Sequence, residues 1–105
     1  MVRAVDAIMS RFRTALDEAY GPRLERVVLF GSRARGDARE DSDWDVAVFL
    51  KEFKSFGEEA DRIAEIETDI LFDTGAVING LPFKAGAYDE PTGLMGELRR
   101  EGVDL

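Results

Sequence analysis

The spacing of apolar residues predicts three helices. Over residues 2–20 the apolar positions recur every three to four residues, and Gly21-Pro22 follows as a helix stop. The same spacing returns over residues 58–73, with Gly75 as the expected C-cap. A last short helix is expected after Pro91-Thr92, ending at Gly102.

Shorter apolar runs predict three strands between these helices. Residues 27–30 and 45–50 lack a polar alternation, which is typical of strands buried on both faces. Residues 76–83 contain Pro82 and are therefore expected to lie at a sheet edge or to end early. Residues 31–43 are expected to form a polar loop with room for one helical turn. The order predicts an α/β (α+β) fold, a small mixed sheet of about three to four strands covered by helices, in a single domain spanning 1–105.

The amino-acid composition limits the kinds of reaction and binding site that the chain can support. The chain has neither cysteine nor histidine, which excludes disulfides, thiolate metal sites and Ser-His or Cys-His nucleophile systems. Its net charge of −8 argues against nucleic acid as a partner. We find no signal peptide and no apolar run long enough for a membrane helix, so a cytoplasmic protein without membrane attachment is expected.

Asp43 and Asp45 are the candidate catalytic and metal-binding residues. Side chains two positions apart in a strand share a face, so both carboxylates project together if the strand begins at or just before Asp43. Paired carboxylates need a cation, and hard oxygen ligands select Mg²⁺ or Mn²⁺. Such ions, often as a pair, serve phosphoryl and nucleotidyl transfer.

A phosphate-binding turn is predicted just upstream. Gly31 follows the strand at 27–30 and lets the backbone approach a ligand closely, and Ser32 adds a hydroxyl donor. Arg33 and Ser42 are further candidates for nucleotide or phosphate binding, although Ser42 also suits a turn and Arg33 also suits a solvated surface. Together, the phosphate-binding turn and the two metal-binding carboxylates match a nucleoside triphosphate bound through a metal ion.

The ordered motif GSRARG…SDWDVAV resembles the signature of the polymerase-beta-like nucleotidyltransferase superfamily, and its short form resembles the minimal nucleotidyltransferases. The resemblance implies that Gly31 and Ser32 grip the triphosphate of ATP and that Asp43 and Asp45 bind two Mg²⁺ ions. It further implies an antitoxin that acts with a HEPN-type toxin and transfers AMP onto it.

One departure from the family pattern leaves two hypotheses open. The family has a third carboxylate on a later strand, but residues 76–83 contain no acid, and Asn79 lies near its expected position. Asn79 can offer a carbonyl oxygen but cannot accept a proton. Asp69, Asp73 or a partner could supply the acid, which keeps an adenylyltransferase possible. The alternative is a degenerate fold that neutralises its partner by binding alone. An enzyme acting on a small acceptor ranks last, because 105 residues leave no second domain for its pocket.

Overall fold

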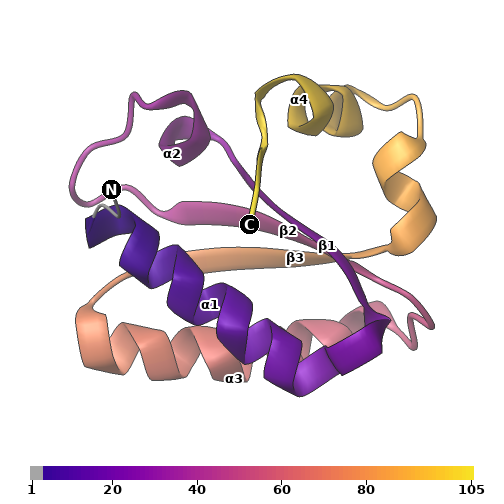
Figure 1. Cartoon of the computed structure of the whole chain (residues 1–105), viewed down its shortest axis with the longest axis horizontal. Coiled ribbons are helices and arrows are strands. Elements are labelled where there is room, and N and C mark those ends of the chain that lie inside the picture. Colours follow the sequence, from indigo (N-terminus) through magenta and orange to yellow (C-terminus); the bar gives the residue numbers. More distant parts are fainter. Residues whose placement is uncertain (1–3) are drawn as a thin grey trace.

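The computed structural model describes residues 4–105, and the start of the first predicted helix, at residues 2 and 3, lies outside them. Helices and strands alternate along the chain (Figure 1). The helical elements are α1 (Ala4–Tyr20), η1 (Gly21–Arg23), α2 (Ser32–Arg35), α3 (Phe56–Thr74), η2 (Ala85–Asp89) and α4 (Gly93–Glu101). The strands are β1 (Leu24–Phe30), β2 (Trp44–Leu50), β3 (Ile78–Lys84) and β4 (Val103–Asp104).

The strands form one mixed sheet in the order β3-β2-β1-β4. Strand β1 pairs antiparallel with β2 and β4, whereas β3 runs parallel to β2. The predicted mixed α+β class with a small sheet is therefore confirmed, and β3 lies at an edge as Pro82 indicated. Strand β4 adds a short pairing that the apolar pattern did not reveal.

Helices cover both faces of the sheet. On one face α1 and α3 pack against Val46 and Val48 of β2 through a buried cluster that includes Phe12, Leu16 and Ile63. On the other face α4 packs against a second cluster, which comprises Val28, Ala47, Phe49, Met95 and Leu98. Successive residues of β2 thus enter opposite clusters, which explains why this strand is apolar throughout.

The ends of the elements differ from the predicted ones by a few residues. Strand β1 begins at Leu24 rather than at residue 27. Helix α3 begins after Ser55, whose side chain accepts a hydrogen bond from the Glu58 amide, so the helix is longer at this end than predicted. The expected C-cap is confirmed, since Gly75 has φ 78° and donates its N–H to Leu71.

Two aromatic residues of α3 are at the surface and not in the core. Apolar type alone predicts core positions for Phe56, Phe72 and Phe83, but Phe56 is 60% and Phe72 is 83% exposed. Phe83 does pack against the cluster beneath α4. Helix α3 turns Ile63, Ile66 and Ile70 inward, and Phe72 lies about 200° around the helix from Ile70.

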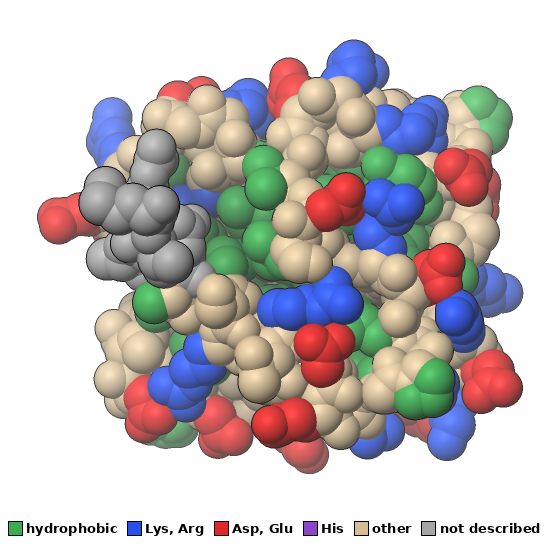
Figure 2. Space-filling view, viewed as in Figure 1, with side chains coloured by type: hydrophobic (Ala, Val, Ile, Leu, Met, Phe, Trp, Pro, Cys, Tyr) green, Lys and Arg blue, Asp and Glu red, His purple; other side chains and the backbone are tan. Residues whose placement is uncertain are grey.

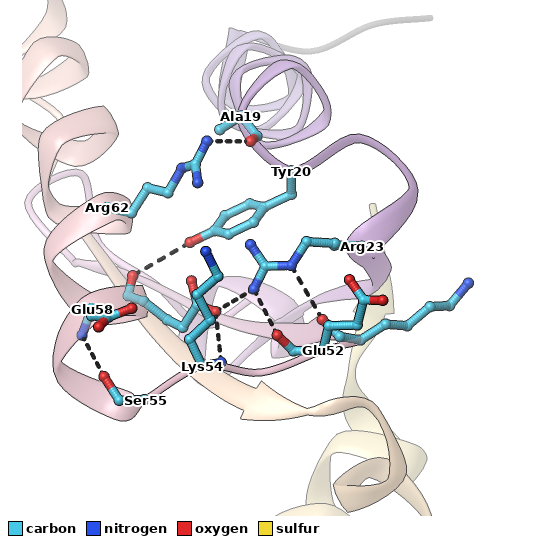
Figure 3. A network of polar contacts seen from close by, with 10 residues as sticks. Ala19, Tyr20, Arg23, Glu52, Lys54, Ser55, Glu58 and Arg62 are labelled. Carbon is cyan, nitrogen blue, oxygen red and sulfur yellow. Dashed lines mark hydrogen bonds and ion pairs between the residues drawn. The ribbon is translucent and has the colours of Figure 1, made fainter.

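A network of polar contacts around a buried acid joins α1, η1 and α3 (Figure 3). Glu59 is 2% exposed, forms an ion pair with Arg23 and accepts a hydrogen bond from the Lys54 amide at 3.2 Å. Burial alone would raise the pKa of Glu59, but the Lys54 amide and the Arg23 guanidinium outweigh it and hold that pKa below its ordinary value. Burial, reinforced by Glu59, raises the pKa of Tyr20 to about 12.

Candidate active site

The two candidate aspartates lie at the N-terminal end of β2. Strand β2 begins at Trp44, so Asp43 lies one residue before it and Asp45 one residue inside it. Asp45 is flanked in the sheet by Phe30 of β1 and Asn79 of β3. The site therefore forms where β1 ends and where β2 and β3 begin.

Asn79 brings the two aspartates together. It is the sheet partner of Asp45, and its Nδ2 donates a hydrogen bond to Oδ2 of Asp43 at 3.0 Å. Trp44 packs into the cluster beneath α1 and α3, so Asp45, the next residue, belongs to the opposite face, which α4 partly covers. Three of the predicted residues thus meet at one end of β2.

Gly31 lies so close to Asp45 that any side chain at this position would have to displace the carboxylate. Its φ is 74°, and a Cβ at this position would come within 2.7 Å of Oδ2 of Asp45. The carbonyl of Gly31 accepts the first helical hydrogen bonds of α2, from Ala34 and Arg35 at 3.1 Å. The amide of Ser32 precedes these bonds, and the first amides of a helix have no intrahelical acceptor.

Arg33 organises the loop that leads to Asp43. Its guanidinium donates to the carbonyl of Ser42 at 2.7 Å and to that of Glu40 at 3.0 Å. It also lies over the ring of Trp44, 4.2 Å from the centroid. Ser42 closes a turn, because its Oγ accepts a hydrogen bond from the Arg39 amide at 2.9 Å. The sequence did not indicate these contacts of Arg33 with the loop carbonyls and the Trp44 ring. A contact between Arg33 and phosphate stays a prediction.

The carboxylates considered as a third acid lie elsewhere. Asp73 forms an ion pair with Arg11 at 2.7 Å, and Asp69 lies on the same helix, α3, which covers the face opposite Asp45. Within the part of the chain that the structure describes, no group of three or more acidic residues could hold a metal ion. Among these residues, Asn79 is the one that occupies the third position beside Asp43 and Asp45.

Glu67 of α3 is a half-buried acid that the sequence did not indicate. It accepts a hydrogen bond from the Gly80 amide on β3, and a Cβ at Gly80 would come within 2.8 Å of its Oε2. Burial raises the pKa of Glu67, and the Gly80 amide offsets part of this effect. Gly80 is turned toward α3, so Glu67 lies across the sheet from the aspartates.

Comparison with known proteins assigns the family. The nucleotidyltransferase domain family matches residues 9–84, which include every residue of the site. The chain therefore belongs to the nucleotidyltransferase domain family and is a nucleotidyltransferase-like enzyme. The resemblance drawn from GSRARG…SDWDVAV is confirmed.

Individual relatives agree with this assignment. A candidate protein adenylyltransferase of Methanocaldococcus jannaschii, MJ0141, is 30% identical over 98 residues, covering 93% of this chain and 95% of its own. A chain from the crystal structure of a toxin–antitoxin complex with AMP-PNP superposes with a TM-score of 0.65 at 18% identity, covering 90% of this chain and 69% of that one. A candidate minimal nucleotidyltransferase gives 0.60 at 23% identity, covering 98% and 97%.

Over the described residues, none of the helices is both long and apolar enough to span a membrane.

Proposed function

We propose that this chain is a cytoplasmic, Mg²⁺-dependent adenylyltransferase that transfers AMP from ATP to a hydroxyl group of a partner protein. The partner is a HEPN-type toxin, for which the chain serves as antitoxin. The M. jannaschii relative and the neighbour from a toxin–antitoxin complex with AMP-PNP support this assignment. The observation that carries it is the contact between Gly31 and Asp45, because it puts the predicted phosphate-binding turn directly against a predicted metal ligand.

The donor set suits magnesium. Asp43 and Asp45 offer carboxylate oxygens, which Mg²⁺ prefers, and the Asn79 amide holds Asp43 in place. These two carboxylates would hold the ion, which would supply positive charge against the triphosphate. Gly31 and Ser32 bind the triphosphate through backbone amides and the Ser32 hydroxyl. The partner's hydroxyl oxygen forms a bond to the α-phosphorus, and the bond to pyrophosphate breaks.

In this mechanism the attacking hydroxyl group of the partner must release its proton to a base. A carboxylate in the third position would accept that proton, and Asn79 cannot. This observation favours a second candidate function, an antitoxin that neutralises its partner by covering it and performs no transfer. A base supplied by the partner would accept the proton and would restore the first candidate function, AMP transfer.

Calorimetry tests the nucleotide site first. We would titrate the chain with ATP, with and without Mg²⁺, beside the variant Asp43→Asn/Asp45→Asn. The control, Asp89→Asn/Glu90→Gln, removes the same charge next to Tyr88, which packs on Phe49 away from the site. Metal-dependent binding that only the site variant loses is expected. Equal binding by all three proteins would refute the assignment of the two aspartates.

A transfer assay then separates the two functions. Labelled ATP incubated with the chain and its cognate toxin should leave AMP on the toxin, and Asp43→Asn/Asp45→Asn should abolish the label. If neutralisation survives in that variant and no AMP is transferred by the wild type, the binding-only antitoxin is the correct description.

A further inference from the structure

The outer side of α3 exposes apolar side chains at its C-terminal end. Phe72 is 83% exposed, and Leu71 and Val77 are each 43% exposed. Leu71 and Val77 line a small hollow together with Glu67, Thr68 and Ile78, between α3 and the start of β3. We call these residues the apolar hollow. Phe72 lies one helical turn beyond Thr68, at the i+4 position, and therefore extends this surface toward the end of the helix.

An acidic groove continues from the hollow along α3. It is lined by Asp61, Glu65 and Asp69 with the small residues Ala64 and Thr68. Thr68 lines both depressions, so the groove and the hollow form one surface. Within the described part of the chain, no ion pair neutralises these three acids. Acidic side chains are visible along the lower edge of the molecule, where α3 lies (Figure 2).

The neighbouring sheet edge does not offer a place for an added strand. The Gly80 amide of β3 is bound by Glu67, and Pro82, two residues further, has no N–H to donate. A segment that binds here therefore has to use side chains in the groove and hollow instead of backbone hydrogen bonds.

We propose that the acidic groove and the apolar hollow dock a basic amphipathic helix of the acceptor protein. Its lysine and arginine side chains lie against Asp61, Glu65 and Asp69, and an apolar side chain enters the hollow beside Phe72. A second copy of this chain fits poorly, because it would bring like charges together, and an anionic lipid surface is repelled for the same reason. This inference rests on the proposed transfer of AMP to a protein.

The surface lies close to the candidate active site. The carbonyl of Val77, which lines the hollow, accepts a hydrogen bond from the amide of Trp44 at 2.9 Å, between the two aspartates. Two residues further along β3, Asn79 contacts Asp43. An acceptor docked on α3 therefore needs to reach around only the edge strand β3 to present a hydroxyl group to the site.

The test uses the full isotope-labelled chain and a synthetic peptide as probe. The peptide is an amphipathic helix of about 18 residues with leucine or phenylalanine at i, i+3, i+4 and i+7 and lysine or arginine elsewhere. Chemical-shift changes are expected at residues 61–78. Phe72→Ser should weaken binding at least about tenfold, as expected for an anchor residue. The matched control is Phe56→Ser, which removes the other exposed aromatic side chain of α3 at its opposite end and should bind like the wild type.

Each outcome decides the proposal. Shifts confined to residues 61–78 that disappear with Phe72→Ser, and with a peptide carrying glutamate in place of lysine, would support it. No binding, shifts elsewhere, or equal binding by Phe72→Ser would overturn it. A dimer in sedimentation that Phe72→Ser dissociates, or stronger binding to anionic vesicles than to the peptide, would also overturn it. An ATP titration of the same samples keeps the questions apart: peptide binding without ATP binding refutes the proposed enzyme, and the reverse refutes the docking surface.

Discussion

Asn79 donates a hydrogen bond to Asp43 from the strand position that pairs with Asp45. A neutral amide therefore lies where a third negative charge would otherwise adjoin two carboxylates. This arrangement lowers the repulsion within the site, and it leaves the site without a proton acceptor at that position.

Restoring the acid should change both stability and metal binding. Without metal, Asn79→Asp is expected to destabilise the chain by about 1 kcal/mol, because it adds a like charge and removes the hydrogen bond to Asp43. Mg²⁺ should reverse this loss, and AMP transfer should increase. Thermal unfolding in EDTA and in Mg²⁺ measures the first effect, and the transfer rate measures the second. Asn79→Ala serves as control, since it removes the hydrogen bond without adding charge. Identical responses of the two variants to Mg²⁺ would contradict the prediction.

Gly31 and Gly36 both have positive φ, but only Gly31 lies against the candidate site. Gly31 and Gly36 have φ of 74° and 84°, but a Cβ would clash with Asp45 at Gly31 and meets nothing within 4 Å at Gly36. Gly36→Ala should lose about 1–2 kcal/mol of unfolding free energy from its left-handed backbone. Gly31→Ala should lose at least as much, because φ 74° with ψ −156° is a region that essentially only glycine adopts. Gly31→Ala should also displace Asp45 and lose ATP binding, which Gly36→Ala should retain. Denaturant unfolding and calorimetry together measure the two effects. Equal ATP affinity in both variants would show that the contact with Asp45 is unimportant.

The buried acid predicts a dependence of stability on pH. Because the folded state holds the pKa of Glu59 below its ordinary value of 4.5, ionised Glu59 stabilises the fold above that pH, and this contribution is lost as the pH falls through the folded-state pKa. Glu59→Gln leaves Arg23 without its charged partner and should cost about 3 kcal/mol at pH 7, and less below pH 4. Urea unfolding across this range measures the effect. Glu58→Gln, at an exposed neighbouring position, should change little at either pH.

Arg33 should not be replaceable by lysine. Its planar guanidinium binds two loop carbonyls and stacks on Trp44, which an ammonium group cannot reproduce. Arg33→Lys should cost about 1–2 kcal/mol and accelerate amide exchange over residues 36–43. Hydrogen exchange followed by mass spectrometry measures this. In Arg35→Lys the exchange should stay as in the wild type, because that side chain is 40% exposed and contacts Asp37 at 3.3 Å on the surface. Unchanged exchange in Arg33→Lys would contradict the role assigned to it.

The sequence predicted most of the elements that show a regular pattern of apolar residues. The helices, the fully apolar β2 and the edge position of β3 follow from spacing and from Pro82. Strand β4 could not be predicted, because two residues show no period. Apolar type alone is misleading for Phe72, because its position around the helix turns it away from Ile70 and into solvent.

Part of the candidate site could be predicted from the sequence, and part could not. Gly31, Asp43, Asp45 and Asn79 could be named because a strand places alternate residues on one face and because the motif resembles a known family. The carbonyl contacts of Arg33 and the burial of Glu59 and Glu67 depend on side chains from distant segments, and no local pattern encodes them.

The packing of Trp44 has a practical consequence. It is the only tryptophan in the chain, it lies between Asp43 and Asp45, and its ring is in contact with Arg33. Its emission is therefore an intrinsic optical reporter of this loop, without any attached dye. Nucleotide or metal that shifts the guanidinium over the ring would alter the fluorescence, so occupancy could be followed in real time on the unmodified protein.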